Sequence, residues 1–123
     1  MRGSIAPDWR PLADIEVFGF DGSPNRVQML VDTGFNRYLT LQRAKADALN
    51  LPLVDSSKVT LADGSEIEVE VRRVVVTWNG QRRMVGAYIT EGDPSIGMAM
   101  LQNCRLQIDV TLGGRVTAES LYP

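Results

Sequence analysis

Apolar residues recur at every second position along most of the chain, in short runs that end in turn-forming residues. Residues 15–20 and 27–31 are two such runs, and the segment between them, DGSPN, consists of turn formers. A period of two is typical of half-buried strands, because successive side chains of a strand point to opposite faces. The pattern therefore predicts a β-hairpin over residues 15–31.

Two more hairpins are predicted further along the chain. Apolar residues alternate over residues 58–71 on both sides of a turn at residues 62–65, and Asn79-Gly80 joins the next two alternating runs. Asn-Gly is a strong hairpin signal, because both residues tolerate the positive φ of a type I′ turn. The alternation changes phase at Arg72-Arg73, which predicts a bend or bulge in that strand.

Only two segments favour a helix. An alanine-rich stretch follows Thr40, the predicted N-cap, and ends at Asn50 and Pro52. A shorter helix is predicted over residues 98–103, before two further strands that end near Val116. The pattern as a whole predicts an all-β domain, a small barrel or folded sandwich, with one or two short helices.

The composition narrows the kinds of function. With 123 residues the chain has room for a single domain over residues 1–123, and 44% hydrophobic and 23% charged residues are typical of a globular protein. The 13 Lys and Arg residues against 15 Asp and Glu residues give a net charge of −2. Such a balance provides no strong field for nucleic acid or for an anionic membrane, so neither is expected as a partner.

Two residue types are scarce enough to exclude whole classes of chemistry. The sequence contains no His, which excludes Ser-His-Asp and Cys-His catalysis and imidazole metal sites. Cys104 is the only Cys, so intramolecular disulfides and thiolate zinc clusters are excluded as well. We therefore expect neither a metal nor a cofactor, and an enzyme built from this sequence would use carboxylates.

The sequence also gives an expectation about location. No apolar run reaches the roughly 18–20 residues of a membrane span, and the first residues, MRGSIAPDWR, lack the pattern of a signal peptide. We expect a soluble, cytoplasmic protein, in agreement with its single Cys. For residues 1–9 two interpretations stay open: the segment is disordered, or it derives from a tag.

One segment combines a buried strand with a carboxylate. Met29-Leu30-Val31 is apolar and leads directly into Asp32-Thr33-Gly34. A carboxylate at the end of a buried strand costs free energy unless it is paired or used. Two interpretations follow from these residues alone: Asp32 caps a turn by accepting a backbone hydrogen bond, or it is a functional group beside a glycine that allows close backbone approach.

The order of elements around this segment resembles the retropepsin-like aspartic proteases. Val31-Asp32-Thr33-Gly34 matches their catalytic motif, and Ser95-Ile96-Gly97 is similar to their apolar-Gly-helix element. The resemblance covers about residues 10–110 and is nearest to small bacterial single-domain members. It implies an all-β, retropepsin-like half-barrel with a flap hairpin and one or two short helices, completed by homodimerisation.

The resemblance also implies a site and a reaction. In this family two Asp carboxylates activate one water for peptide hydrolysis, and the chain carries a single Asp-Thr-Gly motif. A second copy must then supply the second carboxylate, so the implied enzyme is a homodimeric aspartic endopeptidase with Asp32 as its catalytic residue. Thr33 would bond across the dimer, and Gly34 would let the substrate backbone approach.

Further positions are assigned to substrate binding by the same resemblance. The hairpin tip Ala62-Asp63-Gly64-Ser65 resembles the flap that closes over an extended peptide or protein substrate, although its alternation alone fits an ordinary solvated hairpin equally well. Phe35 and Asn36 follow the motif and are expected to face the substrate.

The sequence departs from the family pattern at these last positions. Phe35 is bulky where family members usually have Ala or Ser, and the acidic and Arg residues that pair in retroviral members are replaced by Asn36 and Met98. The alternative function is therefore a catalytically impaired dimer of the same fold that binds peptides or proteins. A structural dimerisation domain in which Asp32 only caps a turn is a third possibility.

Overall fold

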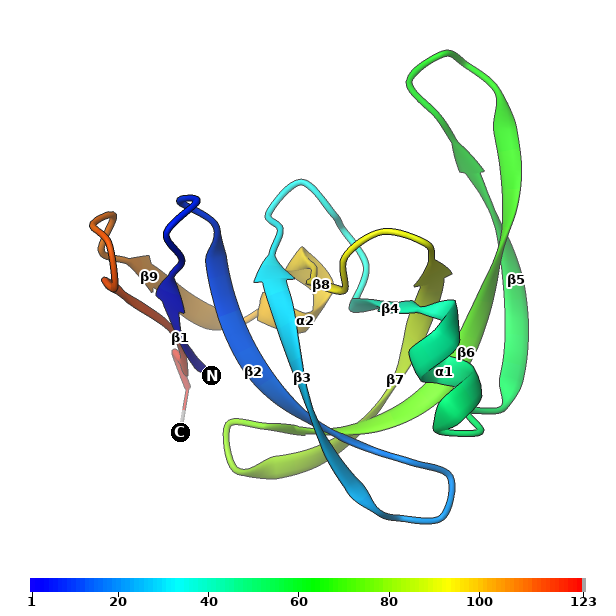
Figure 1. Ribbon diagram of the computed structural model, residues 1–123, viewed down its shortest axis with the longest axis horizontal. Helices are drawn as coiled ribbons and strands as arrows, with labels where there is room; N and C mark the ends of the chain where they lie inside the picture. The colour runs from blue at the N-terminus through cyan, green and yellow to red at the C-terminus, as the bar shows by residue number, and fades with distance from the viewer. Residues whose placement is uncertain (123) are drawn as a thin grey trace.

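The computed structural model describes residues 1–122 and consists mainly of paired strands (Figure 1). Strands make up 56% of it and helices 8%, which confirms the predicted all-β class. The elements in chain order are β1 (Arg2–Ile5), β2 (Pro11–Phe18), β3 (Pro24–Val31), β4 (Leu39–Gln42), α1 (Arg43–Ala48), β5 (Leu53–Thr60), β6 (Glu66–Trp78), β7 (Gln81–Thr90), β8 (Ser95–Ile96), α2 (Met98–Leu101), β9 (Cys104–Ile108) and β10 (Arg115–Ser120).

The strands form one ten-stranded sheet that curls back on itself. Its order is β5-β6-β7-β4-β8-β3-β2-β1-β10-β9, and an additional pairing of β2 with β6 joins Val17 to Val76 and closes the middle strands into a barrel. Closure removes sheet edges from the middle of the molecule. Two extensions remain outside the barrel: β5 beyond β6, and β1, β10 and β9 beyond β2.

The core fills this barrel with the inward-facing residues of the alternating strands. Val17 and Met29 from the first hairpin, Leu41 from β4, Val76 from β6 and Ile96 from β8 are all fully buried. Burying an aliphatic side chain of this size contributes about 1.5–3 kcal/mol, so the row of core residues holds the barrel closed. The ends of β3 and β8, which flank the candidate site, are part of this core.

The three predicted hairpins are confirmed as β2–β3, β5–β6 and β6–β7. The irregularity predicted at Arg72-Arg73 is found in the pairing of Arg72: Leu53 pairs with Arg72 and Asp55 with Val71, so the extra residue lies on β5, and β6 runs through without interruption. A bulge can place its extra residue on either of the two paired strands, and a phase change along the sequence does not say which strand carries it.

The prediction for the first helix is wrong at its N-terminus. Helix α1 begins at Arg43 behind Gln42, with no side-chain cap, and Thr40 lies in β4. The Thr40 hydroxyl is 2.7 Å from the Ser95 hydroxyl on β8, so it pairs across the sheet instead of capping. The second helix ends earlier than predicted, at Leu101.

The first residues of the chain are part of the sheet. Strand β1 pairs with β2 on one side and with β10 on the other, so residues 2–5 do not form a disordered tail. Within residues 1–122, none of the helices combines the length and the apolar character that a membrane span requires.

Candidate active site

Asp32 is held at the end of β3 by its parallel neighbour β8. Val31 pairs with Ile96 in register, both side chains are buried, and the Asp32 N–H donates to the Ile96 carbonyl oxygen at 2.9 Å. Adjacent parallel strands present their carboxyl ends at the same edge of a sheet. The half-buried Asp32 therefore leaves the barrel at a fixed point on the sheet edge.

The turn that follows uses one of the two carboxylate oxygens. The Gly34 N–H donates to Asp32 Oδ1 at 2.9 Å, and the Phe35 N–H donates to the Asp32 carbonyl oxygen at 3.2 Å. The turn-capping geometry considered from the sequence is therefore present. Oδ2 makes no hydrogen bond to any of residues 1–122, so capping the turn leaves the second oxygen available for other chemistry.

The start of α2 holds the rest of the loop through the backbone. The N–H groups of Gly97, Met98 and Ala99 donate to the carbonyl oxygens of Tyr38, Phe35 and Arg37 at 2.8, 2.7 and 3.2 Å. A Cβ at Gly97 would clash with the Arg37 carbonyl oxygen and lie 2.8 Å from that of Phe35. Only glycine allows the loop to pack this closely on β8.

These backbone hydrogen bonds lie around Asn36 and Met98, the two positions that replace the acidic–Arg pair of the retroviral members. Asn36 and Met98 are both exposed, and the side chain of Asn36 makes no hydrogen bond within the described chain. The loop is therefore braced by main-chain hydrogen bonds from the Gly97-Met98 turn, which do not depend on those two side chains. Main-chain hydrogen bonds of this kind hold the loop in one geometry without the desolvation cost of a buried ion pair.

Phe35 lines a pocket next to the loop. Its ring meets the Tyr88 ring edge-on, with centroids 5.9 Å apart at 72°, and its other side approaches Gly97. A cavity of about 350 Å³ lies beside it. It is lined by Phe35, Tyr88 and Ile89 from the barrel and by Val59, Ile67 and Val69 from the β5–β6 hairpin.

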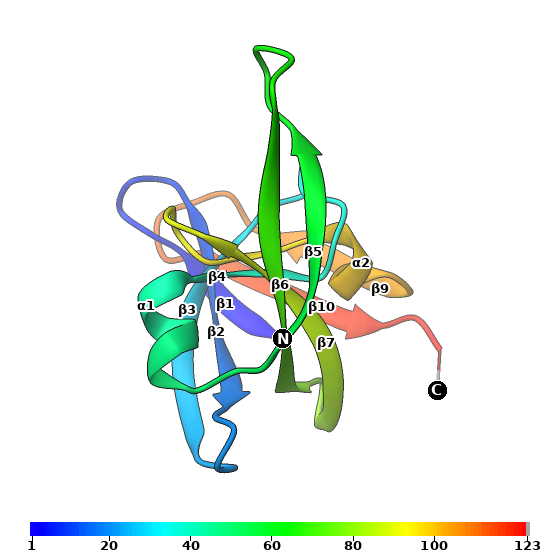
Figure 2. The same ribbon diagram turned by 90° about the vertical axis from the view of Figure 1, so that its right-hand side faces the viewer.

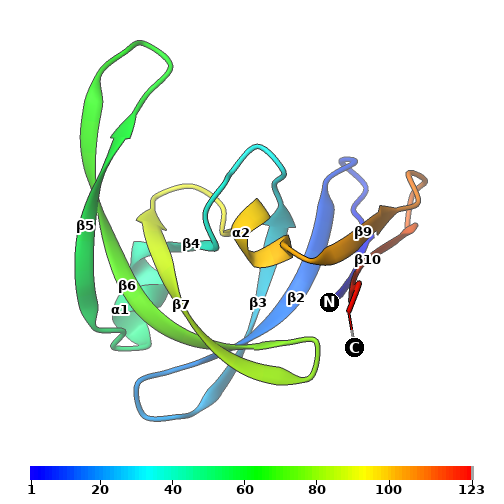
Figure 3. The same ribbon diagram turned by 180° about the vertical axis from the view of Figure 1, so that it is seen from behind.

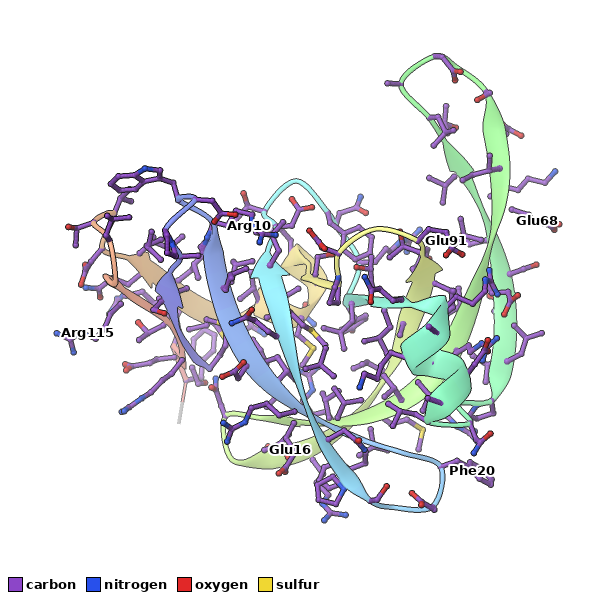
Figure 4. All side chains as sticks on the ribbon, in the orientation of Figure 1. Arg10, Glu16, Phe20, Glu68, Glu91 and Arg115 are labelled. Carbon is purple, nitrogen blue, oxygen red and sulfur yellow. The ribbon has the colours of Figure 1, made fainter. Side chains whose placement is uncertain are left out.

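The composition of this pocket sets what it can bind. Its walls are mostly apolar and aromatic, and Glu68 and Glu91 are also among its lining residues. Figure 4 shows these two glutamates at the side of the molecule where the hairpin rises from the barrel. An open apolar pocket of this size accommodates one or two aliphatic or aromatic side chains.

The predicted flap tip lies apart from Asp32. The β5–β6 hairpin projects beyond the barrel (Figure 1), and within residues 1–122 no hydrogen bond or ion pair joins residues 62–65 to the Asp32 loop. Gly64 has φ +86°, and the Gly64 N–H donates to the Leu61 carbonyl oxygen at 2.9 Å. Asp63 accepts the hydroxyl and N–H of Ser65 at 2.6 and 2.9 Å, and these bonds lower the pKa of Asp63.

Thr33 and Gly34, the remaining predicted site residues, stand beside Asp32 in the same turn, and both are exposed. The Thr33 side chain makes no hydrogen bond to any of residues 1–122. Across residues 1–122, no three acidic or thiol side chains come together in a way that could hold a metal ion.

Two solved structures with a similar fold are named as proteases. A retropepsin-like aspartic protease from Rickettsia conorii superposes with a TM-score of 0.59 over 98% of this chain and 91% of its own, at 14% sequence identity. EIAV protease, complexed with the inhibitor HBY-793, superposes with a TM-score of 0.57 over 76% of this chain and 86% of its own, at 18% identity. The chain has the retropepsin-like fold. At the level of sequence, no protein-family model and no curated protein matches it.

The retropepsin-like fold brings in residues that sequence reasoning missed. Tyr88 forms a wall of the pocket with Phe35, and Thr40, which also lines the pocket, pairs with Ser95. Tyr88 is one of several residues in an alternating strand, so nothing local distinguishes it. Ser95 directly precedes the Ile96-Gly97 element, and a hydroxyl at that place in the sequence was the available signal.

Proposed function

We propose that this protein is an aspartic endopeptidase that hydrolyses peptide bonds as a homodimer. The observation that carries the proposal is Asp32 itself. Its carboxylate is fixed at the end of a buried strand by one oxygen, while the other oxygen has no partner among residues 1–122. The similarity to solved aspartic proteases supports the same reading.

The reaction requires a second carboxylate beside the first. The chain has one Asp-Thr-Gly segment, so the second group is Asp32 of the partner subunit, brought close by a two-fold axis. Two carboxylates so close together cannot both ionise readily, and the pair shares one proton. The ionised member takes a proton from a water that attacks the scissile carbonyl carbon, and the protonated member donates to the carbonyl oxygen.

The neighbouring residues take positioning roles in this proposal. Thr33, whose hydroxyl is free of bonds within the described chain, bonds across the axis and keeps the two loops level. Gly34 allows the substrate backbone to approach Asp32. Phe35 and Asn36, the next residues of the loop, contact substrate side chains.

The substrate is an extended peptide that runs between the Asp32 loop and the flap. Main-chain hydrogen bonds to the tip, Ala62-Asp63-Gly64-Ser65, hold such a peptide, while side-chain pockets provide specificity. The 350 Å³ pocket between Phe35 and Val59 favours an apolar substrate side chain. No cofactor or metal enters the reaction.

The alternative is a dimer of the same fold that binds peptides without cleaving them. Phe35 favours it, because a bulky residue directly follows the Asp32-Thr33-Gly34 segment where members of the resembled family usually have Ala or Ser. The two functions differ in turnover: the alternative predicts peptide affinity with no cleavage between pH 3 and pH 7, a range in which a carboxylate pair passes through its singly protonated form.

The deciding experiment replaces Asp32 with Asn. The Asn side-chain oxygen can still accept the Gly34 N–H, so we expect the fold and melting temperature to be kept while peptide cleavage falls by at least ~10³-fold. Asp21→Asn is the matched control, because Asp21 accepts the Ser23 N–H at 2.9 Å in an equivalent turn away from the site. Cleavage that survives Asp32→Asn would refute the proposed function.

A further inference from the structure

Two hairpins meet at the end of the barrel that lies away from the Asp32 loop. In Figures 2 and 3 the loop after β3 and the β5–β6 hairpin point toward one end of the molecule, and the β2–β3 and β6–β7 hairpins toward the other. The pairing of β2 with β6 joins these two hairpins, with Val17 opposite Val76 and Phe18 opposite Val75. A binding surface at this end is therefore separate from the candidate active site.

Outward-facing apolar residues form a row across this end. Phe18 of β2, Val75 of β6 and Met84 of β7 are directly opposite one another in the two strand pairs, so their side chains lie on the same face of the sheet. The neighbours of Val75 along β6, Val74 and Val76, are buried in the core. Successive side chains of a strand point to opposite faces, which places the row on the outside of the barrel.

A small groove lies along this row. We call it the outer groove; it encloses about 180 Å³, and its lining includes Phe20 of the turn after β2, Pro52 before β5, and Arg73 of β6, besides the apolar row. Phe20 and Met84 are 69% and 63% exposed. Pockets for small-molecule ligands usually measure roughly 300–1,000 Å³, so this cavity suits a single apolar side chain of another protein. Contiguous exposed apolar residues are typical of such interaction sites.

Two arginines flank the outer groove. Arg73 is part of its lining, and the guanidinium carbon of Arg82 lies 4.2 Å from the centroid of the Phe18 ring. Within residues 1–122 neither guanidinium forms an ion pair or a side-chain hydrogen bond. Both positive charges are therefore available to a partner.

Two carboxylates near the outer groove are engaged by hydroxyl groups of the chain. Thr77, the residue opposite Arg82, donates its hydroxyl to Glu16 at 2.8 Å. Asp21, in the turn after β2, accepts the Ser23 hydroxyl at 2.6 Å and the Ser23 N–H at 2.9 Å. Among residues 1–122 neither carboxylate is ion-paired with an arginine. The charge that the groove itself presents is positive.

The spacing of the two arginines suits an extended segment. Arg82 lies opposite Thr77, so it stands four residues along the β6 direction from Arg73. At about 3.3 Å per residue this separation is about 13 Å, and the paired residues Val75 and Met84 lie midway. In an extended chain, residues i, i+2 and i+4 point to one face and span the same distance. An acidic residue at each end and an apolar residue in the middle match the groove.

We propose that the outer groove binds an extended segment of another protein with the pattern acidic-x-apolar-x-acidic. The apolar side chain enters the cavity beside Val75 and Met84, while the two carboxylates pair with the guanidinium groups of Arg73 and Arg82. The groove is complementary to such a segment in both polarity and charge. This binding goes beyond the proposed function and does not depend on it.

The occupant is not a second copy of this chain. Glu66 and Glu70 are the only two acidic residues that stand four positions apart in the sequence. The residue midway between them is Glu68, which is a third charge instead of an apolar side chain. No segment of the chain has the required pattern, so the partner is a different protein.

The first experiment measures binding of a designed peptide to the full chain. The probe is a fluorescently labelled heptapeptide, Gly-Glu-Thr-Leu-Thr-Glu-Gly, and its affinity is measured by fluorescence anisotropy at about pH 7, where the carboxylates are ionised. The control peptide, Gly-Glu-Glu-Leu-Thr-Thr-Gly, has the same composition and charge but places its carboxylates side by side. We expect the first peptide to bind at least about tenfold more tightly. Equal affinities, or binding of neither peptide, would overturn the proposal.

Charge reversal tests the two arginines. Arg73→Glu and Arg82→Glu should each weaken binding of the probe peptide at least about fivefold, because an attraction becomes a repulsion. Arg115→Glu is the matched control: it changes the net charge equally, and Figure 4 shows Arg115 on the opposite side of the molecule from Phe20. Equal weakening by all three substitutions would show a dependence on net charge alone and would contradict the proposed site.

Exchanging charges between protein and peptide tests the register. The segment lies in one direction, so Lys in place of the first Glu of the peptide should restore binding to one of the variants Arg73→Glu and Arg82→Glu. Lys in place of the second Glu should restore binding to the other variant. If each Lys peptide restored binding to both variants equally, or to neither, the two-ended arrangement would be wrong.

The apolar contact is tested from both sides. Met84→Ala in the protein and Leu→Ala in the peptide should each weaken binding several-fold. Because both remove the same contact, the two changes together should weaken binding by less than the product of their separate effects. Effects that simply multiply would mean that the leucine lies elsewhere and would refute the assigned pocket. Thermal melts of each variant show whether its fold is kept.

Discussion

The Asp32 loop and the flap hairpin are both turns at the end of strands, yet they are held in different ways. The Asp32 loop is bonded to β8 and to the start of α2 by backbone hydrogen bonds from residues distant in sequence, and Gly97 lets it pack closely. The flap tip is bonded only to itself, and residues 60–68 are all exposed. Segments with few buried contacts open at low free-energy cost, while packed loops open only when the fold does.

This difference fits the two roles in the proposed reaction. A reacting carboxylate has to be held within a fraction of an ångström, and a rigid loop next to the core provides that. A flap has to move aside for the substrate and return, which a loosely held hairpin allows. The comparison predicts that equal chemical changes in the two regions have unequal consequences.

The largest effect on stability is expected from Gly97→Ala. The added methyl group meets the carbonyl oxygens of Arg37 and Phe35, which are backbone atoms and cannot rotate away. We expect unfolding in urea to show a loss of about 2–4 kcal/mol, together with loss of cleavage. Gly92→Ala is the control, because its methyl group would meet only the Thr90 hydroxyl at 3.6 Å. The account of the packed loop fails if both variants are equally stable.

A smaller and local effect is expected from Gly64→Ala in the flap. Gly64 has φ +86° with no atom near its missing side chain, so the cost is backbone strain of about 1 kcal/mol. Hydrogen exchange should become faster for amides of residues 59–67 and stay unchanged for residues 32–38. Faster exchange in both regions would show that the flap and the Asp32 loop are coupled.

The smallest effect is expected at the base of the flap. Arg43 of α1 binds Glu70 of β6 at 3.0 Å, Arg72 binds the same carboxylate at 3.0 Å, and these two bonds lower the pKa of Glu70. A lowered pKa means that the stabilisation is present above the ordinary value of 4.5 and is lost as the pH falls through the folded value.

Glu70→Gln should therefore lower the melting temperature at pH 6 by less than roughly 3 °C, and the difference from the wild type should disappear in acid. Thermal melts of both proteins between pH 3 and pH 6 measure this. A difference that grows as the pH falls would contradict the assigned cause.

The sequence predicts the local elements better than their partners. The hairpins follow from alternation and turn residues, and the placement of Asp32 after a buried strand follows from Met29-Leu30-Val31, because both depend on neighbours in the chain. Thr40 shows the limit: its position before an alanine-rich segment fits an N-cap, yet its hydroxyl pairs with Ser95, which is 55 residues away.

The same limit applies to the candidate site. Its catalytic candidate is visible as a motif, but the pocket joins Phe35 to Tyr88 and to the hairpin through pairings between distant strands. The closure of the barrel by Val17 and Val76 depends equally on a long-range register. Such registers are set by the packing of the whole core, which local patterns do not contain.

The central claim is that two chains share one pair of carboxylates, and mixed dimers test it most directly. Wild-type and Asp32→Asn chains are unfolded together in equal amounts, refolded, and assayed for peptide cleavage at fixed total protein. If each active site takes one Asp32 from each chain, only dimers with two wild-type chains cleave, and activity falls to about one quarter of the wild-type value. Activity of about one half would show that each chain carries a complete site of its own and would contradict the account.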